Sequence, residues 1–389
     1  MATGMPFGNY QYEIYLGGMA DQVPEHPMSW AEWEARAAAT LADGPRGYLF
    51  GGAGTEDAMR ANLEAFRRWR IVPRMLRDVS ARDLSTELLG TAMPAPVLMA
   101  PVGVQSILHD DGELASARAA SSQGVPYIAS TAGSYTLEDI AEAVGDGPRW
   151  YQLYWPRGEE LAASFVARAE AAGYSALVVT LDTGLLGWRP RDLVGAYLPF
   201  LKSIGIANYV NDPVFRSTLE KPPEEDPQAA VGQFVGVFSN PTVTWDDLAW
   251  LREQTSLPIV LKGILHPDDA REAVARGVDG VIVSNHGGRQ VDGAIATLDA
   301  LPGVVEAAGD DIAVLMDSGI RCGADAFKAL ALGADAVLLG RPAMWGLAVA
   351  GEDGVRTVLR SFLAELDLTL ALSGHTSLET VGSDTLQRA

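Results

Sequence analysis

Short runs of apolar residues alternate with segments of helical periodicity from residue 94 onward. Within each run the apolar residues are continuous and do not alternate with polar ones. Continuous apolarity is typical of strands that are covered on both faces, as they are in parallel sheets. There are eight such runs, at residues 96–101, 126–130, 150–154, 176–182, 258–263, 280–285, 313–319 and 336–342.

Residues that commonly begin helices stand between these runs. Thr136, Thr244, Pro267 and Gly323 each precede a segment with helical spacing of apolar side chains, as expected at helix N-termini. A strand followed by a helix, repeated along one chain, is typical of α/β proteins. Eight repeats predict a closed (β/α)8 barrel, the TIM barrel, and not an open sheet.

Two segments fall outside this repeat. Residues 1–93 are expected to form a mostly helical extension that caps the flank and rim of the barrel. Residues 184–243 form a long insertion after the fourth strand, and its KPPEEDPQAA segment (221–230) has the composition of a mobile loop. An insertion of this length is usually a lid or a linker. We expect a lid over the substrate, because the insertion leaves from the face that carries the chemistry.

The whole chain, residues 1–389, is expected to form one domain, with the barrel at residues 94–350. Residues 351–389 are expected to supply a closing helix, with helical periodicity at 355–374, and a tail.

The composition of the chain disfavours some classes of binding partner. The chain has 389 residues, 29 basic against 50 acidic ones, and a formal charge of −21, which disfavours nucleic acid and anionic membranes as partners. No basic leader is present, and no stretch approaches the roughly 20 apolar residues of a spanning helix. The single cysteine, Cys322, forms no intrachain disulfide. A cytoplasmic protein is predicted, and a small anionic substrate would need a locally positive pocket.

Polar residues gather where the predicted strands end. The carboxyl ends of the strands carry the chemistry in (β/α)8 barrels, so these residues are candidates for a site. They are Tyr154, Asp182, Lys262, His286, Asp317 and Arg341.

The most informative motif is SNHGGRQ (284–290), directly after the sixth strand. His286 titrates near neutrality and suits the removal of a proton from a substrate. Arg289 offers a planar fork that matches a carboxylate. One short motif therefore supplies a candidate base and a candidate substrate clamp.

Together with TLDT (180–183), GWRPRD (187–192) and PIVLKG (258–263), this motif resembles the signature of the FMN-dependent 2-hydroxy acid oxidase and dehydrogenase family. The resemblance extends from about Tyr48 to Leu372. Within the family, NYQYEIY, MSWAEWEA and NYVNDPVF are most similar to the lactate 2-monooxygenase branch. The resemblance implies FMN as cofactor, a small 2-hydroxy acid and O2 as reactants, and a homotetramer or octamer. No metal site is expected.

The resemblance assigns further site residues. Asp182 is expected to pair with His286, Arg189 to be the second carboxylate-binding arginine, and Tyr154 and Tyr48 to hydrogen-bond the substrate. Lys262 is expected beside flavin N1 and the C2 oxygen, where a fixed ammonium stabilises developing negative charge. A Schiff-base role for this lysine is the rival interpretation. Arg191 is expected to anchor the loop.

Cofactor contacts are expected around the whole mouth of the barrel. The loops after strands 7 and 8 often bind phosphate, where Gly319 and Gly340 allow close approach and Arg321 and Arg341 supply charge. The resemblance implies that Asp317 binds the ribityl chain. It also implies flavin contacts from Pro101, Val102, Gly103, Ser130, Gln152, Thr180 and Ser284.

Ala132 departs from the family pattern, in which larger side chains stand here. Alanine widens the space over the substrate's side chain, so mandelate-like acids could also fit. The leading hypothesis is oxidation of L-lactate with decarboxylation of the 2-oxo acid inside the site. An oxidase that releases the 2-oxo acid and hydrogen peroxide is the alternative. Hydride and carbanion routes both stay open.

Overall fold

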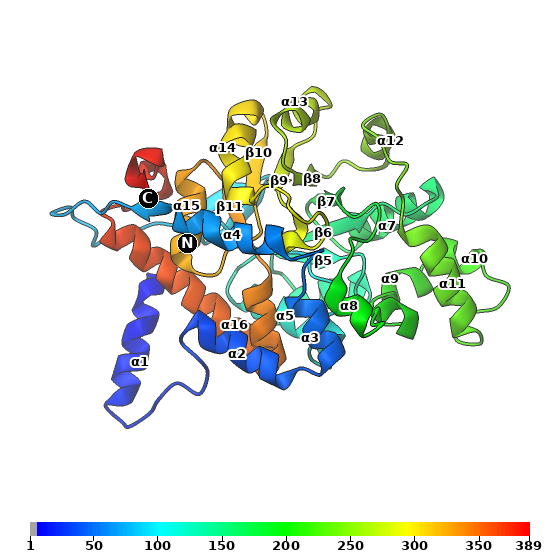
Figure 1. Cartoon of the computed structure of the whole chain (residues 1–389), viewed down its shortest axis with the longest axis horizontal. Coiled ribbons are helices and arrows are strands. Elements are labelled where there is room, and N and C mark those ends of the chain that lie inside the picture. The colour runs from blue at the N-terminus through cyan, green and yellow to red at the C-terminus, as the bar shows by residue number, and fades with distance from the viewer. Residues whose placement is uncertain (1–5) are drawn as a thin grey trace.

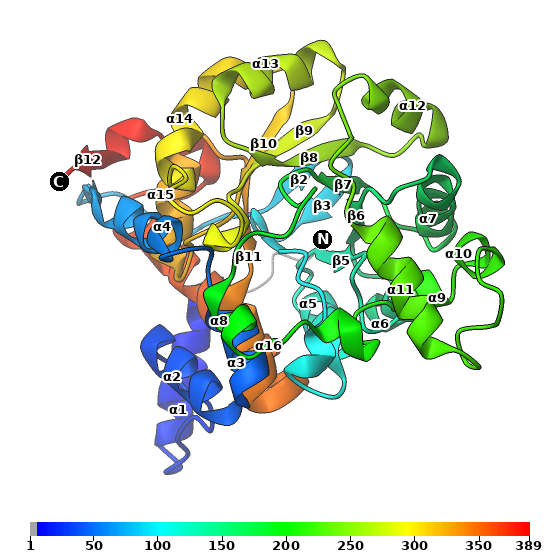
Figure 2. The same cartoon turned by 45° about the vertical axis from the view of Figure 1, so that its right-hand side comes forward.

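A closed barrel of eight parallel strands forms the centre of the computed structural model, which describes residues 6–389 (Figures 1 and 2). The strands follow one another around the barrel in chain order, and β11 closes it against β4. Each strand falls on one of the eight apolar runs, so the predicted (β/α)8 fold is confirmed. The strands are β4 (Val97–Met99), β5 (Tyr127–Ser130), β6 (Arg149–Tyr154), β7 (Leu177–Thr180), β8 (Ile259–Ile264), β9 (Gly280–Val283), β10 (Ala313–Met316) and β11 (Ala336–Leu339).

A ring of helices surrounds the strands (Figure 2). Thr136 forms the expected capping box with Asp139, which satisfies backbone donors at the helix start. The helix expected after Thr244 begins three residues later, at Asp247. The Asp247 carboxylate accepts the Thr244 N–H at 2.6 Å and so satisfies a backbone donor just before the helix. The helices are α5 (Gly112–Ser122), α6 (Leu137–Val144), α7 (Glu159–Ala171), α12 (Asp247–Gln254), α13 (Pro267–Ala275), α14 (Thr297–Ala308), α15 (Gly323–Ala331) and α16 (Arg341–Leu372).

Helix α16 is longer than expected. It begins directly after β11 and is broken at Ala350 and Gly351, where the backbone leaves helical geometry. The helix predicted for residues 355–374 is the part after this break. Short 3-10 helices occur at Phe7–Asn9, Gln105–Ile107, His286–Gly288, Leu378–Thr380 and Ser383–Thr385.

The N-terminal extension is helical only in its first part. Helices α1 (Tyr10–Gly18), α2 (Trp30–Thr40), α3 (Asp43–Phe50) and α4 (Asp57–Arg67) precede three short strands that the sequence pattern did not predict. Strand β1 (Trp69–Ile71) pairs with β12 (Leu386–Arg388), and β2 (Thr86–Leu88) pairs with β3 (Thr91–Met93). Strands of three residues are too short to show a period, which explains the error.

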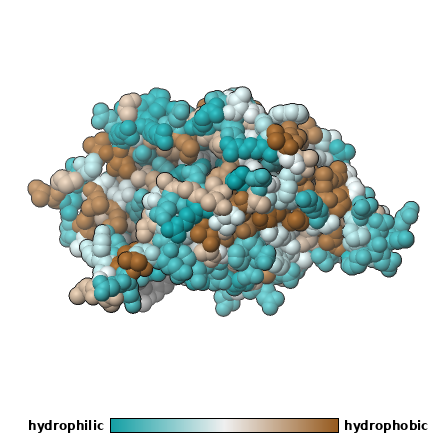
Figure 3. All heavy atoms as spheres, turned by 60° about the horizontal axis from the view of Figure 1, so that its bottom comes forward, coloured by the Kyte–Doolittle hydropathy of each residue, from teal (hydrophilic) through white to brown (hydrophobic). Residues whose placement is uncertain are grey.

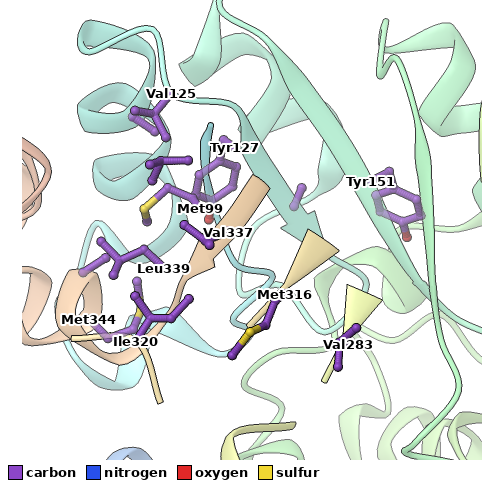
Figure 4. Close-up of a cluster of buried hydrophobic side chains, with 14 of the residues drawn as sticks. Met99, Val125, Tyr127, Tyr151, Val283, Met316, Ile320, Val337, Leu339 and Met344 are labelled. Carbon is purple, nitrogen blue, oxygen red and sulfur yellow. The ribbon is translucent and has the colours of Figure 1, made fainter. Parts of the chain in front are cut away.

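The β2–β3 hairpin contributes to the core inside the barrel. Leu88 and Met93 pack with inward-facing strand residues such as Ile128 and Leu315. Trp150 is fully buried among them, and its indole N–H donates to Thr91 Oγ1 at 2.9 Å. Outward-facing strand residues form a second core against the helices, part of which is shown in Figure 4 with Met99, Tyr127, Val337 and Leu339.

Residues 184–243, the segment expected to be a lid and called the lid from here on, contain four helices and a 3-10 turn and are not structureless. The KPPEEDP stretch of the lid leads into a helix at Pro227, where Asp226 accepts the Ala229 N–H at 3.0 Å. Within the segment, the buried rings of Tyr209 and Phe234 pack edge to face, with 4.9 Å between their centroids. The lid contains α8 (Pro190–Val194), the 3-10 turn Pro199–Lys202, α9 (Ala207–Val210), α10 (Pro213–Ser217) and α11 (Pro227–Phe238).

One stretch of the lid, Pro190–Val210, is long and apolar enough to cross a membrane by length and composition alone. This differs from the sequence-based expectation, although internal segments of water-soluble proteins meet the same criterion. In the fold the stretch is divided into three short helices. The molecular face in Figure 3 mixes hydrophilic residues with several patches of hydrophobic ones.

Candidate active site

A cleft of about 160 Å³ lies at the carboxyl ends of the barrel strands, where (β/α)8 barrels carry their sites. Strand ends, the lid and helix α3 all contribute side chains to its lining. Most of the residues singled out from the sequence line it. These are Tyr48, Pro101, Val102, Gly103, Ala132, Tyr154, Arg189, Lys262, His286, Arg289, Asp317, Gly319, Arg321, Gly340 and Arg341.

The remaining candidates lie just behind this lining. Asp182 contacts His286 and Ser284 contacts Lys262. Ser130 donates to Gln152 Oε1 at 2.9 Å, and Thr180 pairs with Lys262 in the barrel register. The structure thus brings all the candidates to one end of the barrel.

The SNHGGRQ segment is held in an unusual backbone shape. His286 has a φ of 57°, a left-handed conformation that non-glycine residues seldom adopt outside constrained sites. Gly288 also has a positive φ, and a Cβ on it would lie 2.6 Å from the Met59 amide nitrogen. Asn285 fixes the segment by exchanging side-chain hydrogen bonds with Asn62, both of 2.8 Å. Helix α4 therefore holds the loop that presents His286.

His286 and Asp182 form a hydrogen-bonded pair, with 2.8 Å between Nδ1 and Oδ1. Burial lowers the pKa of His286, and the Lys262 and Arg189 charges act in the same direction against the pull of Asp182. Burial alone would raise the pKa of Asp182, but its interaction with His286 and the Lys262 charge hold it well below its ordinary value. A neutral imidazole that donates Nδ1–H to a carboxylate leaves Nε2 free to accept a proton.

Arg289 is anchored by one guanidinium nitrogen and left unpaired at the other. Its Nη1 donates to the carbonyls of Tyr48 and Gly51 at 2.6 and 3.0 Å, whereas Nη2 is buried without an acceptor. The guanidinium also lies 4.8 Å from the centre of the Tyr48 ring. Burial, followed by repulsion from Arg189, lowers the pKa of Arg289 to about 10. The side chain is thus still cationic at neutral pH, with a donor available for an anion.

Arg189 reaches the cleft from the lid and is connected to the barrel through Gln290. Its Nε donates to the Arg289 carbonyl at 3.0 Å and its Nη2 to Gln290 Oε1 at 2.7 Å. Gln290 in turn donates to the Asp182 carbonyl at 2.6 Å. Arg191 pairs with Glu56 at 2.6 Å, as expected of a loop anchor. The lid is therefore fastened to the rim on both sides of Arg189.

Lys262, which is buried, and Tyr154, which is partly buried, are polar groups beside the His286–Asp182 pair. Lys262 Nζ donates to Ser284 Oγ at 2.9 Å and lies 3.4 Å from Asp317 Oδ2. Burial opposes its charge, but Asp317 and Asp182 outweigh burial and raise the pKa of Lys262. Burial raises the pKa of Tyr154, which therefore stays a neutral phenol. A cationic lysine cannot form a Schiff base without losing a proton, so this setting favours the electrostatic role.

Two partly buried arginines mark the far end of the cleft. Arg341 begins α16 and donates to the carbonyls of Leu49, Gly51 and Gly287. Arg321 lies over the Trp345 ring at 5.3 Å. Burial lowers the pKa of both guanidinium groups. Cations packed together at a helix N-terminus are the usual setting for a phosphate.

The two glycines at this end differ. Gly319 has a φ of 91°, and a Cβ on it would lie 2.8 Å from the Asn62 carbonyl oxygen. Gly340 has a negative φ, and a Cβ there would meet only Ala100, at 3.7 Å. Packing within the chain therefore requires glycine at position 319 but not at 340, where the added atom would take space at the edge of the cleft.

Two further polar atoms, on strands β6 and β7, lack hydrogen-bond partners. Gln152 Nε2 and Thr180 Oγ1 are buried and make no hydrogen bond. Buried polar groups in proteins are nearly always satisfied, so both atoms are suited to a bound polar ring system. A phosphate end, a polar middle and a cationic lysine together fit a flavin nucleotide.

Several residues that shape the cleft were missed from the sequence. Thr183 donates to Asp182 Oδ1 at 2.8 Å, and Gln290 stands inside the SNHGGRQ motif, where its position could have indicated a role. Phe200 and Phe238 line the cleft from the lid, but no signal marked them in a segment interpreted as a loop. Among residues 6–389, no group of three or more His, Cys, Asp or Glu side chains could hold a metal ion.

Comparison with known proteins decides the family. The model of the FMN-dependent dehydrogenase family matches residues 37–388. The chain belongs to this family. Its cofactor is accordingly FMN, which agrees with the phosphate end and the unsatisfied polar atoms of the cleft.

The relatives of this FMN-dependent dehydrogenase are similar over nearly their whole length. An L-lactate oxidase of Lysinibacillus sphaericus (strain C3-41) is 46% identical over 374 residues, 96% of each chain. 2-Hydroxyacid oxidase 1 of Homo sapiens is 42% identical, over 90% of this chain and 94% of its own. The crystal structure of mandelate oxidase matches with a TM-score of 0.82 at 39% identity, over 93% of this chain and 98% of that one. The chain is thus an FMN-dependent 2-hydroxy acid oxidoreductase.

Proposed function

We propose that this enzyme oxidises L-lactate with O2 and converts the product to acetate, carbon dioxide and water before it leaves the site. The lid is the observation that carries this proposal. Its Arg189 lines the cleft and is fastened to the rim through Gln290, while Arg191 is fastened to Glu56. A covered cleft slows the exit of a small acid, and product release sets the outcome of many enzyme reactions.

The side chains supply binding and proton transfer. Arg289 Nη2 and the Arg189 guanidinium hold the substrate carboxylate, and the phenols of Tyr48 and Tyr154 lie beside it. His286 Nε2 accepts the proton of the C2 hydroxyl. Asp182 stabilises the imidazolium that results and fixes the orientation of the ring.

The cofactor is held by residues around the mouth of the barrel. Arg321, Gly319 and the start of α16 hold its phosphate, Asp317 its ribityl chain, and Gln152, Thr180 and Lys262 its ring. Bound FMN supplies the acceptor for the C2 hydrogen and passes two electrons on to O2. If the 2-oxo acid is still bound, hydrogen peroxide then adds to its C2 carbonyl and the bond between C2 and the carboxyl carbon breaks. One pyruvate and one hydrogen peroxide give one acetate, one carbon dioxide and one water.

A second candidate function is oxidation of a larger, aromatic acid with release of the 2-oxo acid and hydrogen peroxide. Ala132 lines the cleft with its small side chain, and the apolar residues Val102, Ile107 and Leu108 line the same cleft. This apolar wall would accept a phenyl group without displacing a larger residue. The mandelate oxidase structures share the fold over nearly all of this chain.

Proton NMR of the products after aerobic turnover of L-lactate distinguishes the candidates. Catalase must be present, so that free peroxide does not decarboxylate pyruvate that has already been released. We expect acetate. Pyruvate as the main product would refute the in-site decarboxylation and leave an oxidase. Turnover of L-mandelate without turnover of L-lactate would support the second candidate.

A further inference from the structure

Asp192 is a buried carboxylate without a role in the steps above. It lies in lid helix α8 and is 9% exposed. Its Oδ1 is buried and has no hydrogen-bond partner, and its Oδ2 lies 4.0 Å from Arg289 Nη2. Burial raises the pKa of this carboxyl against the pull of Arg289 and Arg189. Keeping a charge in this position has an energetic cost, which calls for an explanation.

The distance to Arg289 is informative. A separation of 4.0 Å is too long for a hydrogen bond but short enough for strong attraction between charges. Asp192 therefore offsets the cation without occupying the donor, and Arg289 Nη2 is the donor left for a substrate carboxylate. Asp192 and the substrate would share one guanidinium.

The backbone connects Asp192 with the second clamp residue. Its N–H donates to the carbonyl of Arg189 at 3.1 Å, and its own carbonyl accepts the Tyr197 N–H at 2.9 Å. Arg189 and Asp192 thus lie on one turn of the lid, while Arg289 belongs to the barrel rim. The lid thus contributes the Arg189 cation to the cleft lining and places the Asp192 anion beside the Arg289 guanidinium.

We propose that Asp192 is a resident counter-anion of the carboxylate clamp, which repels the bound 2-oxo acid and speeds its release. The inference rests on the proposed function, because it takes a 2-oxo acid as the product held by the two arginines. In a partly desolvated cleft the repulsion between two carboxylates is stronger than in water. Asp192 would thereby set how much product leaves before peroxide can decarboxylate it.

The test is Asp192→Asn, which removes the charge and keeps the size of the side chain. Pyruvate is titrated into the oxidised holoenzyme, and flavin absorbance reports the Kd. We expect the Kd to fall at least about fivefold, as loss of about 1 kcal/mol of repulsion requires. In turnover of L-lactate with catalase present, the ratio of acetate to pyruvate should rise. Asp192→Glu should restore wild-type affinity.

A matched control separates charge from loosening of the lid. Glu56→Gln removes the charge that anchors Arg191, whose Nη2–Oε2 distance is 2.6 Å, and so weakens the anchor without changing the charge beside Arg289. This variant should not bind pyruvate more tightly. A Kd for Asp192→Asn that is unchanged or increased would overturn the inference, since Asp192 would then only orient Arg289. Tightening in Glu56→Gln of the same size would overturn it as well.

A second probe keeps this test independent of the assigned substrate. Benzoylformate presents the same carboxylate with an aromatic side chain. If only benzoylformate binds, and binds Asp192→Asn more tightly, the counter-anion is supported while the lactate assignment fails. Failure of both acids to bind either protein would overturn both.

Discussion

The two ends of the barrel are built on opposite principles. At the amino end, the β2–β3 hairpin closes over Ile128, Leu315 and their neighbours, and the buried indole of Trp150 has its partner in Thr91. At the carboxyl end, Gln152 Nε2, Thr180 Oγ1 and Arg289 Nη2 are buried without partners. Leaving such groups unsatisfied costs about 1–3 kcal/mol each. The amino end of the barrel therefore stabilises the fold, whereas the carboxyl end lowers its stability by keeping polar groups available to bind ligands.

The largest effect expected at the carboxyl end is that of His286→Gln. Loss of the base should slow flavin reduction by L-lactate about 10²–10⁴-fold, while the thermal unfolding temperature and FMN content stay near those of the wild type. Anaerobic stopped-flow absorbance measures the rate. Reduction at the wild-type rate would remove His286 from its assigned role.

The matching change at the amino end is Met93→Ala. Met93 is 3% exposed in the cluster under the hairpin, so truncation should lower the free energy of unfolding by about 2–5 kcal/mol. Urea denaturation measures this loss, and kcat should hardly change. A large fall in kcat without loss of stability would show that the two ends are not separate in function.

Within the carboxyl end, Arg289 and Arg191 form a matched pair of cations. Arg289→Lys removes the fork that leaves Nη2 free, and should lower kcat/KM for L-lactate about 30-fold, equivalent to about 2 kcal/mol. Arg191→Lys should have a small effect, because Arg191 is half exposed and pairs with Glu56 away from the substrate. Equal losses in the two variants would contradict the assignment of the clamp.

The smallest effect concerns pH. His286 must be neutral to accept a proton, so the rate of flavin reduction should rise with pH through its pKa. Because burial lowers the pKa of His286, this rise should lie below about pH 6.5, the ordinary value for histidine. Asp182 pulls this pKa upward, so Asp182→Asn should move the rise to still lower pH. Stopped-flow rates of flavin reduction between about pH 4.5 and about pH 8, a range that brackets the ordinary pKa of histidine, test both shifts.

The barrel was predictable from the sequence because its strands are buried on both faces. Residues 176–179 (ALVV), for example, are uninterrupted apolar residues, and tertiary burial agrees with local propensity there. The β1–β12 and β2–β3 pairs were not predictable, because three residues such as Trp69–Ile71 carry no measurable period. Only part of the lid was misinterpreted: proline and acidic residues in 221–230 indicate a loop, yet Pro227 begins a helix there and Asp226 caps it.

The site was predictable as far as its motifs reach. His286, Arg289 and Lys262 stand at strand ends, and their convergence follows from barrel topology. The roles of Gln290 and Asp192 depend on contacts between lid and rim, which no local pattern contains. The tetramer or octamer and the cytoplasmic location stay predictions.

The closure of the barrel between β4 and β11 has a consequence for biosynthesis. About 240 residues separate the two strands, and at about 5–20 residues per second a ribosome needs on the order of 10–50 seconds to make them. During this time β4 has an open edge, and unpaired apolar edges invite association with other chains. Correct production of this enzyme should therefore depend on how well the nascent chain is shielded until its eighth strand emerges.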